Sequence, residues 1–429
     1  MEIKFSEIEN ELQKIASPGI HPGLARLSKL LALLGNPERQ FKAVHVVGTN
    51  GKGSTSAAVE NILRCSGCKT ALYTSPHLAC FGERLLINGE MLPAADWLRV
   101  IERIKTVLKN SGTAEEDMPT YFELTTASAF MLTAQKNVDI AVIEAGLGGR
   151  LDATNTLENV VLTLVTPIGI DHTDYLGDTL EKIAAEKFAV IRRNVPAIFA
   201  GGDETLEKQF LEKCAQEGTN GSLLSKTEYS LTETSLDGTI LSFRGKSYKT
   251  ALAGAYQADN TALALSAAEE LRKSFGGITE ETVRTALSTI KWQGRMEIVR
   301  KNPLLLLDGA HNPHAIKRLA ENIKLIFKGQ KICSVTAMMR DKDVKNALGL
   351  LKELNLELYC TEVPQMERSM KAEEMAETAE NLGFDVRGNF DSPYDAVKEA
   401  SKQGCPVLCF GSLYMLAWLK ENYPEEFLK

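Results

Sequence analysis

The stretch from His45 to Thr55 constrains this chain more than any other. It reads His-Val-Val-Gly-Thr-Asn-Gly-Lys-Gly-Ser-Thr, and it joins a short apolar segment to a pattern with helical spacing. Glycines let successive backbone amides point at one concave spot, and the first turn of a helix adds the positive end of its dipole there. Because such a hollow suits a phosphate group, the sequence predicts a phosphate-binding loop between a strand and a helix.

The loop is a variant of the standard phosphate-binding pattern. Two residues instead of four separate Gly48 from Gly51, and Gly53 separates Lys52 from the hydroxyl of Ser54. A helix terminus alone contributes only about 0.3–1 kcal/mol to holding an exposed anion, so a triphosphate also needs the lysine and the hydroxyl groups. A glycine-rich turn with an incidental lysine is the alternative, and the coincidence of lysine, serine and glycines after a strand disfavours it.

Composition narrows the class of protein. With 429 residues, 44% of them hydrophobic, the chain is too long for one ordinary core, and two or three domains are expected. A net charge of −7 argues against a general nucleic-acid binder, since such proteins carry a basic face. Because the chain has neither a signal-peptide core nor an apolar run of roughly twenty residues, we expect a cytoplasmic protein without nucleic-acid or membrane partners.

The eight cysteines offer no second His/Cys pair spaced to complete a zinc site. Cys65 and Cys68 have the spacing of a redox pair, but they fall at the end of a predicted helix. We therefore expect reduced, partly buried thiols.

Most of the chain alternates predicted strands with predicted helices, an order typical of a parallel sheet covered by helices. Between residues 225 and 249 the pattern changes to short alternating strands around Asp237-Gly238, which predicts a small antiparallel patch. Two helices are expected in residues 1–40 and one after Thr179, with further helices at 94–110, 121–135, 254–271 and 279–287 and strands at 69–73, 139–143 and 160–165.

A second alternation begins after Arg295. Its predicted strands lie near 304–308, 331–337, 357–363 and 406–410, and its helices near 313–326, 344–353, 371–382, 393–402 and 413–422. We therefore predict an α/β protein of two domains. Residues 1–297 would form a mainly parallel sheet with the antiparallel patch, and residues 298–429 a smaller Rossmann-like domain.

Polar side chains follow several predicted strands of the first domain. Ser75, Glu144 and His172 each come just after a strand, at the edge where α/β sheets bind ligands. A hydroxyl, a carboxylate and an imidazole facing a phosphate loop could hold two Mg²⁺ ions, which take hard ligands and keep several waters. Each residue alone could instead start a turn, cap a helix or occupy a loop, but their coincidence at three strand ends favours a metal site.

Together these blocks resemble the folylpolyglutamate synthase and dihydrofolate synthase family, within the Mur-type ATP-dependent amide ligases. The resemblance covers almost the whole chain and implies a Mur-ligase-like, ATP-binding central domain in residues 1–297 and a Rossmann-like ligase domain in residues 298–429. It rests on Gly-Thr-Asn-Gly-Lys-Gly-Ser at 48–54, Thr-Ser-Pro-His-Leu at 74–78, Glu83-Arg84, Phe122-Glu123, the block 144–155, Asp171-His172, Leu176-Gly177, Gly294-Arg295, Asp-Gly-Ala-His-Asn-Pro at 308–313 and Gly-Ser-Leu-Tyr at 411–414.

The resemblance implies roles for single residues. Ser75 and Glu144 would bind one Mg²⁺, and His172 the second. The phosphates and the rest of ATP would contact Asn50, Gly51, Lys52, Gly53, Ser54, Asn260, Arg295 and Asp308, with His311 in the same loop. A pteroate-like substrate would contact Pro22, Gly23, Leu24, Phe122, Leu151, Asp152 and Ala153, although on sequence alone Phe122 could equally belong to the core.

In this family a lysine at the position of Lys187 carries a carbamate that bridges toward the second ion. Carbamylation needs a neutral amine, and at an ordinary pKa only roughly one lysine in a thousand is neutral at pH 7, so burial would have to lower the pKa. A surface lysine is the alternative. Two departures from the family pattern concern us: Phe188-Ala189-Val190 follows the lysine where Ala-Gly-Ile is usual, and Tyr256 stands where His is usual.

The resemblance implies ATP-dependent addition of L-glutamate to dihydropteroate, to the γ-carboxylate of folates, or to both, through an acyl phosphate. Lys52, His172 and Lys187 would serve catalysis, and the partners would be small molecules bound by a monomer. A peptidoglycan ligase is disfavoured by Asp152–Asn155 and Thr74–His77. A P-loop motor or switch would hydrolyse ATP without a carboxylate acceptor, and a dinucleotide oxidoreductase would need the GxGxxG that 146–149 lacks.

Overall fold

The computed structural model describes residues 3–19 and 21–422. Its internal contacts divide the chain into two compact units. The first unit holds the residues up to Tyr229 together with 243–245 and 259–290, and the second holds 230–242, 246–258 and the chain from Lys291 onward. The second unit therefore includes residues on both sides of position 297. The division into domains 1–297 and 298–429 stays a prediction.

The first unit is built on an eight-stranded, mainly parallel sheet with the strand order β4-β3-β2-β5-β1-β6-β7-β8. Its central strands are apolar and buried on both faces, as expected where helices cover a parallel sheet on both sides. Only β3 and β4, at one edge, run antiparallel to their neighbours. The strands are β1 (Lys42–Val47), β2 (Thr70–Tyr73), β3 (Leu85–Ile87), β4 (Glu90–Met91), β5 (Ile140–Glu144), β6 (Val160–Val165), β7 (Ala197–Phe199) and β8 (Gly221–Leu223).

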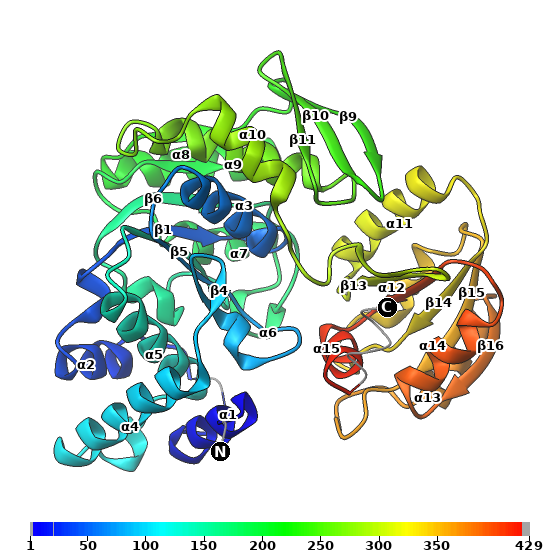
Figure 1. The fold of residues 1–429 in the computed structure, drawn as a ribbon, viewed down its shortest axis with the longest axis horizontal. Coiled ribbons are helices and arrows are strands. Elements are labelled where there is room, and N and C mark those ends of the chain that lie inside the picture. The colour runs from blue at the N-terminus through cyan, green and yellow to red at the C-terminus, as the bar shows by residue number, and fades with distance from the viewer. Residues whose placement is uncertain (1–2, 20, 423–429) are drawn as a thin grey trace. The chain divides into compact units, whose positions relative to one another are not determined.

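Helices cover this sheet on both faces. Figure 1 shows α1, α2, α4 and α5 on one side, where Trp97 and Phe130 enter a core shared with Ala43 and Ile143 of the sheet. On the other side α3 contacts β1, β2 and β5, and α10 packs on α3. The helices are α1 (Phe5–Ile15), α2 (Ala25–Leu33), α3 (Lys52–Cys65), α4 (Ala94–Asn110), α5 (Tyr121–Gln135), α6 (Thr173–Leu176), α7 (Leu180–Phe188), α8 (Glu204–Glu217), α9 (Gln257–Leu271) and α10 (Glu280–Thr289).

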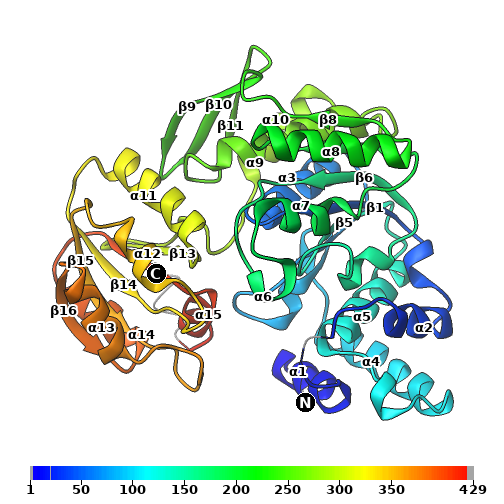
Figure 2. The ribbon, with the colours of Figure 1, turned by 180° about the vertical axis from the view of Figure 1, so that it is seen from behind.

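The second unit contains a six-stranded sheet with the order β12-β13-β17-β14-β15-β16, parallel except at β12. Helix α13 contacts β15 and β16, and α14 contacts β14 to β17, an arrangement visible in Figure 2. The strands are β12 (Glu297–Lys301), β13 (Leu304–Asp308), β14 (Ile332–Thr336), β15 (Leu356–Thr361), β16 (Asp385–Phe390) and β17 (Val407–Phe410), and the helices are α11 (Pro313–Phe327), α12 (Val344–Gly349), α13 (Ala372–Asn381), α14 (Pro393–Ser401) and α15 (Leu413–Asn422).

The predicted antiparallel patch is a three-stranded sheet with the order β11-β10-β9. Its strands are β9 (Tyr229–Ser235), β10 (Gly238–Phe243) and β11 (Lys246–Thr250), with the predicted hairpin turn at Asp237-Gly238. The α/β class, with a mainly parallel sheet, this patch and a second α/β sheet, is confirmed. Among the described residues, no helix is long and apolar enough to cross a membrane.

Several element bounds match the prediction and others do not. Helices 94–110 and 121–135 and strand 160–165 have the predicted ends, whereas α12 stops at Gly349 instead of near 353. Strands β12 and β16 were not predicted, because each lies at a sheet edge with half-exposed, partly charged residues instead of an apolar run. All eight cysteines are free thiols, and Cys65 and Cys68 are partly buried.

Candidate active site

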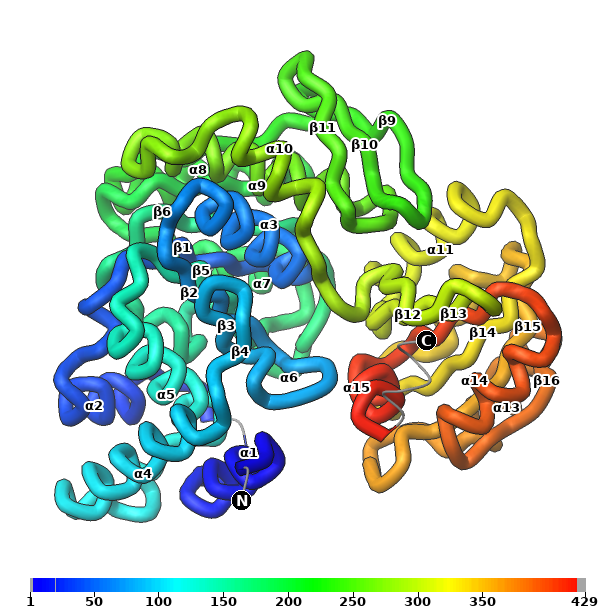
Figure 3. The backbone as a smooth tube through the Cα atoms, viewed as in Figure 1, coloured from blue at the N-terminus to red at the C-terminus, as the bar shows by residue number. Residues whose placement is uncertain are grey.

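The predicted phosphate loop lies between the end of β1 and the start of α3, as the trace in Figure 3 shows. Gly48 and Gly51 both have positive φ angles, 145° and 88°. A Cβ on Gly48 would lie 1.9 Å from Thr166 Oγ1, and one on Gly51 would lie 2.2 Å from Asn260 Oδ1. Both positions therefore require glycine, and Gly51 brings the loop against Asn260, a residue predicted to contact the nucleotide.

Thr49 fastens the loop to the segment that follows β6. Its backbone N–H donates to Pro167 O over 3.1 Å, and the N–H of Gly169 donates to its hydroxyl oxygen over 3.0 Å. Ser54, in the first turn of α3, is buried. The loop thus has a fixed shape, and the segment that it contacts continues into Asp171 and His172.

Two lysine side chains converge on the same carbonyl of this loop. Lys52 Nζ lies 3.3 Å from Gly48 O and 3.2 Å from Thr49 O, and Lys187 Nζ donates to Gly48 O over 2.8 Å. Lys187 is only 3% exposed. Burial first, and then the positive charge of Lys52, lower the pKa of Lys187 to about 7. A substantial share of this amine is therefore neutral at pH 7, which is the condition that carbamylation requires.

The lowered pKa of Lys187 predicts a pH-dependent stability. The folded amine loses its proton near pH 7, whereas the unfolded amine keeps it to about pH 10.5. The penalty of burying the charge is therefore complete below pH 7 and disappears as the pH rises toward 10.5. Relative to Lys187→Met, the free energy of unfolding of the wild type should rise by roughly 1.4 kcal/mol per pH unit between pH 7.5 and 9.5. Urea titrations in buffer freed of carbon dioxide measure this, and equal slopes for the two proteins would contradict it.

The segment after Lys187, where the sequence departs from the family pattern, packs into a core. Phe188 is 1% exposed, and its ring centroid lies 5.3 Å from that of Phe199 and 5.5 Å from that of Phe210. A Cβ on Gly149 would lie 2.6 Å from Glu186 O, so the glycine-rich loop 146–149 lies directly on α7. The larger side chain at 188 therefore packs into this core and supports the helix that carries the lysine.

Two of the three predicted metal ligands lie at or just after strand ends, whereas His172 lies seven residues after the end of β6. Glu144 is the last residue of β5 and is 5% exposed, and the backbone N–H of Ser75 donates to its Oε2 over 3.3 Å. His172 precedes α6 with φ 51°, its side chain is 46% exposed, and its Nε2 lies 4.0 Å from Asp171 Oδ2. Within 3–19 and 21–422, no three His, Cys, Asp or Glu side chains form a metal-binding group.

The predicted substrate residues come together in the first unit. Phe122, in the first turn of α5, packs on Gly146, where a Cβ would lie 2.5 Å from the ring. Asp152 is 5% exposed and accepts the N–H of Leu147 over 2.7 Å, and burial raises the pKa of its carboxyl group. Leu151 is half-buried and Ala153 is buried beside it. The aromatic ring and the acidic loop are therefore held by one glycine-rich turn.

Pro22, Gly23 and Leu24 form the loop that leads into α2. Arg26, which the sequence analysis missed, ties this loop to α5: its guanidinium donates to His21 O and to both oxygens of Glu123, over 3.2 and 3.1 Å. Glu123 also accepts the N–H of Thr120 over 2.7 Å. The sequence shows Arg26 close to Pro22, but it does not indicate the contact with Glu123, which lies 97 residues away.

The second unit holds a separate cluster of predicted residues at the end of β13. Asp308 is 2% exposed; its Oδ2 accepts the N–H of Met296 over 3.0 Å, and its Oδ1 accepts the N–H of Ala310 over 2.9 Å. Arg295 lies beside it, with Nη1 2.4 Å from where a Cβ of Gly309 would be. His311 is placed by a 2.8 Å hydrogen bond from its Nδ1 to Gly309 O.

Tyr256, which stands where the family usually has histidine, contacts this cluster. Its hydroxyl donates to Asp308 Oδ2 over 3.3 Å, and burial raises the pKa of both groups. The tyrosine therefore supplies a donor to the same carboxylate that the sequence analysis predicted to contact the nucleotide. The substitution leaves this polar site intact.

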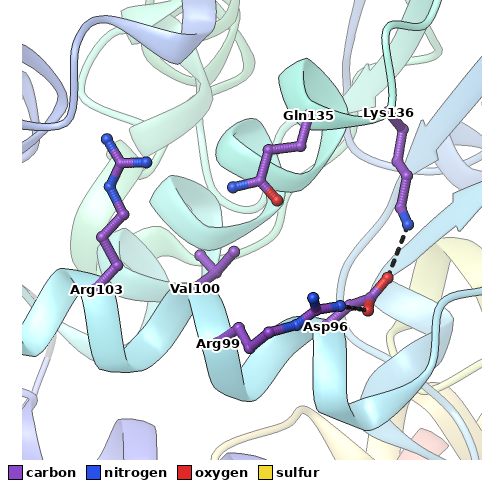
Figure 4. A pocket seen from close by; sticks show the side chains of 6 residues that line it. All are labelled: Asp96, Arg99, Val100, Arg103, Gln135 and Lys136. Atoms are coloured by element: carbon purple, nitrogen blue, oxygen red, sulfur yellow. Dashed lines mark hydrogen bonds and ion pairs between the residues drawn. The ribbon is translucent and has the colours of Figure 1, made fainter.

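A pocket of about 320 Å³ lies elsewhere in the first unit, between α4 and the end of α5 (Figure 4). Lys136 Nζ donates to Asp96 Oδ2 over 2.8 Å, and Arg99 donates to the other oxygen of this carboxylate. Val100 forms part of the lining. The Lys136–Asp96 pair fastens the end of α5 to α4, whereas the Arg99–Asp96 pair lies within α4.

Two domain families match long stretches of this chain. Residues 46–268 match the Mur ligase middle domain, and residues 294–413 match the Mur ligase glutamate ligase domain. The chain is 33% identical over 415 residues to the dihydrofolate synthase/folylpolyglutamate synthase of Bacillus subtilis, covering 94% of this chain and 95% of that protein.

Two solved structures share the fold over almost the whole chain. A Mycobacterium tuberculosis folylpolyglutamate synthase complexed with ADP and AMPPCP has a TM-score of 0.86 at 27% identity, covering 97% of both chains. An Escherichia coli structure in complex with DHPP and ADP has a TM-score of 0.84 at 30% identity, covering 99% of this chain and 98% of the other.

Proposed function

This chain belongs to the folylpolyglutamate synthase and dihydrofolate synthase family of Mur-type ligases, and from this we propose that it joins the amine of L-glutamate to a folate-type carboxylate with ATP as co-substrate. The acceptor is dihydropteroate, the terminal γ-carboxylate of a folate, or both. The observation that carries the proposal is the glycine loop on which the amines of Lys52 and Lys187 converge at Gly48 O. It offers backbone amides and the amine of Lys52 to a nucleotide phosphate.

The reaction proceeds in two steps. An oxygen of the acceptor carboxylate attacks the γ-phosphorus of ATP, the bond to the bridging oxygen breaks, and ADP leaves an acyl phosphate behind. The neutral amine of glutamate then attacks the acyl carbon. Phosphate leaves and takes with it the carboxylate oxygen that attacked phosphorus in the first step, and the nitrogen loses a proton. Lys52 offsets the negative charge that develops on the transferred phosphoryl group, and the amides of Asn50, Gly51, Gly53 and Ser54 orient it.

The residues at the strand ends fit Mg²⁺. This ion is usually held by one or two carboxylates together with phosphate oxygens and waters, so a buried carboxylate beside a hydroxyl suffices without a larger protein cluster. We propose that Ser75 and Glu144 hold one ion and that His172 holds a second. When bound, the ions would neutralise phosphate charge and polarise the phosphoryl group.

Lys187 has the environment that a carbamate requires. Its neutral amine can attack carbon dioxide and lose a proton, which converts a buried neutral group into a negatively charged one beside Lys52. We propose that this carbamate completes the set of oxygen ligands near His172. The apolar packing of α7 keeps the group in place.

The remaining predicted residues keep their roles as proposals. Asn260, Arg295, Asp308 and His311 contact the nucleotide, and Tyr256 supports Asp308 through its hydroxyl. The acceptor binds at Pro22, Gly23, Leu24, Phe122, Leu151, Asp152 and Ala153, where the Phe122 ring offers a flat face to a heterocycle. The expectations of a monomer and of a cytoplasmic location rest on the sequence alone.

ADP release tests the proposed function. The wild type should release ADP only when glutamate and an acceptor are both present, and a comparison of dihydropteroate with tetrahydrofolate identifies the acceptor. Product analysis should show one glutamate added per ADP released. Equal ADP release without acceptor and glutamate would instead support a P-loop NTPase of the motor or switch type.

A further inference from the structure

A buried hydrogen-bonded chain connects β1, the strand that precedes the phosphate loop, to the loop that carries Asp152. Arg192 Nη1 lies 3.3 Å from His45 Nδ1, His45 Nε2 lies 2.8 Å from Thr154 Oγ1, and Thr154 Oγ1 lies 2.5 Å from Asp152 Oδ1. His45 and Thr154 are fully buried, and they are 109 residues apart in the sequence. None of these contacts is part of the role that the sequence analysis gave to Asp152.

The chemistry of the four groups sets one direction for the hydrogen bonds. A guanidinium can only donate, so His45 Nδ1 must accept from Arg192. A neutral imidazole then carries its proton on Nε2 and donates it to Thr154 Oγ1. The hydroxyl proton of Thr154 is free to go to Asp152 Oδ1. Every bond in the chain is satisfied when the histidine is neutral, and burial together with the charge of Arg192 lowers the pKa of His45 in the same sense.

Arg192 also holds the far side of the loop. Its Nη2 donates to Asn155 Oδ1 over 2.9 Å and to Leu157 O over 3.2 Å, and its Nη1 donates to Val190 O over 2.7 Å. Asn155 in turn donates to Arg150 O over 3.0 Å. Hydrogen bonds from the guanidinium of Arg192 and the imidazole of His45 therefore hold the segment from Arg150 to Leu157 in place.

Asp152 links this support to the proposed acceptor site. Its second oxygen accepts the N–H of Leu147, in the turn on which Phe122 packs through Gly146. A change at His45 would therefore be transmitted through Thr154 to the carboxylate, and through it to the turn beneath the aromatic ring. Rigid support of this kind is what a binding loop needs in order to keep its side chains within a fraction of an ångström of the productive position.

We propose that His45 and Arg192 are positioning residues for the acceptor: through Thr154 and Asn155 they set the place of Asp152 and its neighbours Leu151 and Ala153, without touching the acceptor themselves. The inference rests on the proposed function, because it assigns the loop to acceptor binding. It predicts that damage to the chain raises the KM for the acceptor and leaves the KM for ATP nearly unchanged.

Two substitutions at His45 distinguish the contributions of the two ring nitrogens. In His45→Gln the side-chain amide nitrogen can replace Nε2 and still donate to Thr154. In His45→Asn the amide oxygen can replace Nδ1 and accept from Arg192, but the side chain is too short to reach Thr154. We expect His45→Gln to stay within about twofold of the wild-type KM for the acceptor and His45→Asn to raise it about tenfold, with the KM for ATP within about twofold in both.

Thr154→Val breaks the same link from the other side with nearly unchanged side-chain volume, and it serves if a His45 variant fails to fold in thermal unfolding. Alone it should also raise the acceptor KM about tenfold. Because both changes remove one shared interaction, the double variant His45→Asn/Thr154→Val should remain near tenfold. Arg192→Met, which frees Asn155 and Leu157, should raise the acceptor KM in the same selective way.

The results that would overturn the inference are distinct from those that bear on the function. A hundredfold rise in the double variant, equal effects of His45→Gln and His45→Asn, an unchanged acceptor KM in Arg192→Met, or an equal rise in the KM for ATP would each contradict a positioning role. In all of those cases the wild type still forms product. Absence of acceptor-dependent product from the wild type would instead refute the proposed function itself.

Discussion

Lys52→Ala should abolish measurable ligation with either acceptor while the fold remains intact. The proposed function gives this amine the role of offsetting the charge that develops on the phosphoryl group, and removing one such preorganised donor costs about 10²–10³-fold in kcat. Among the described residues, the hydrogen bonds of this amine go to the carbonyls of Gly48 and Thr49, so its loss leaves no buried carboxylate unpaired. Steady-state kinetics together with thermal unfolding measures both effects.

Lys182→Ala is the matched control for this experiment. Lys182 lies on α7, its side chain is 63% exposed, and it forms an ion pair with the exposed Asp178. Its removal therefore changes the net charge of the protein by the same amount as Lys52→Ala, but at the surface. We expect near-normal kinetics from this control. Near-normal ligation by Lys52→Ala would refute the role given to Lys52.

Lys187→Ala should lower kcat by about 10²-fold or more, and added acetate or another short carboxylic acid should restore part of the activity. The expected loss follows from removing a carbamate that sits in a buried, charge-sensitive place, where such groups contribute several kcal/mol to the transition state. The truncation opens space next to Gly48 O, so a small carboxylate can enter and stand in for the lost group.

The rescue should depend on the size of the acid, because the space left by the lysine side chain is limited. Acetate and propionate should help more than a branched acid, and none should affect Lys182→Ala. Wild-type activity of Lys187→Ala without any added acid would count against the bridging role.

Local patterns were sufficient for much of this fold. The helices at 94–110 and 121–135 have the predicted ends because the signals that define them are local; Thr120, for example, directly precedes the second helix and caps it by accepting the N–H of Glu123. The edge strands β12 and β16 escaped prediction for the opposite reason. A strand at an edge is held by its neighbour's backbone, and its own side chains can be polar.

The same distinction holds at the candidate site. The glycines of the phosphate loop and the apolar surroundings of Lys187 are visible in the sequence, but the approach of Lys52 to Lys187, which contributes to the lowered pKa, exists only in the folded chain. The pairs Arg26–Glu123 and His45–Thr154 join residues 97 and 109 positions apart. No single-sequence pattern links such pairs, because their contacts arise from the order of strands in the sheet.

The most direct test of the central claim follows the oxygen atoms of the acceptor. With an acceptor whose carboxylate carries ¹⁸O in both positions, ligation through an acyl phosphate must transfer one labelled oxygen to inorganic phosphate in every turnover and leave the other in the amide. We predict one ¹⁸O in each phosphate released by the wild type, measured by mass spectrometry. Phosphate without label, released while the amide forms, would contradict the account.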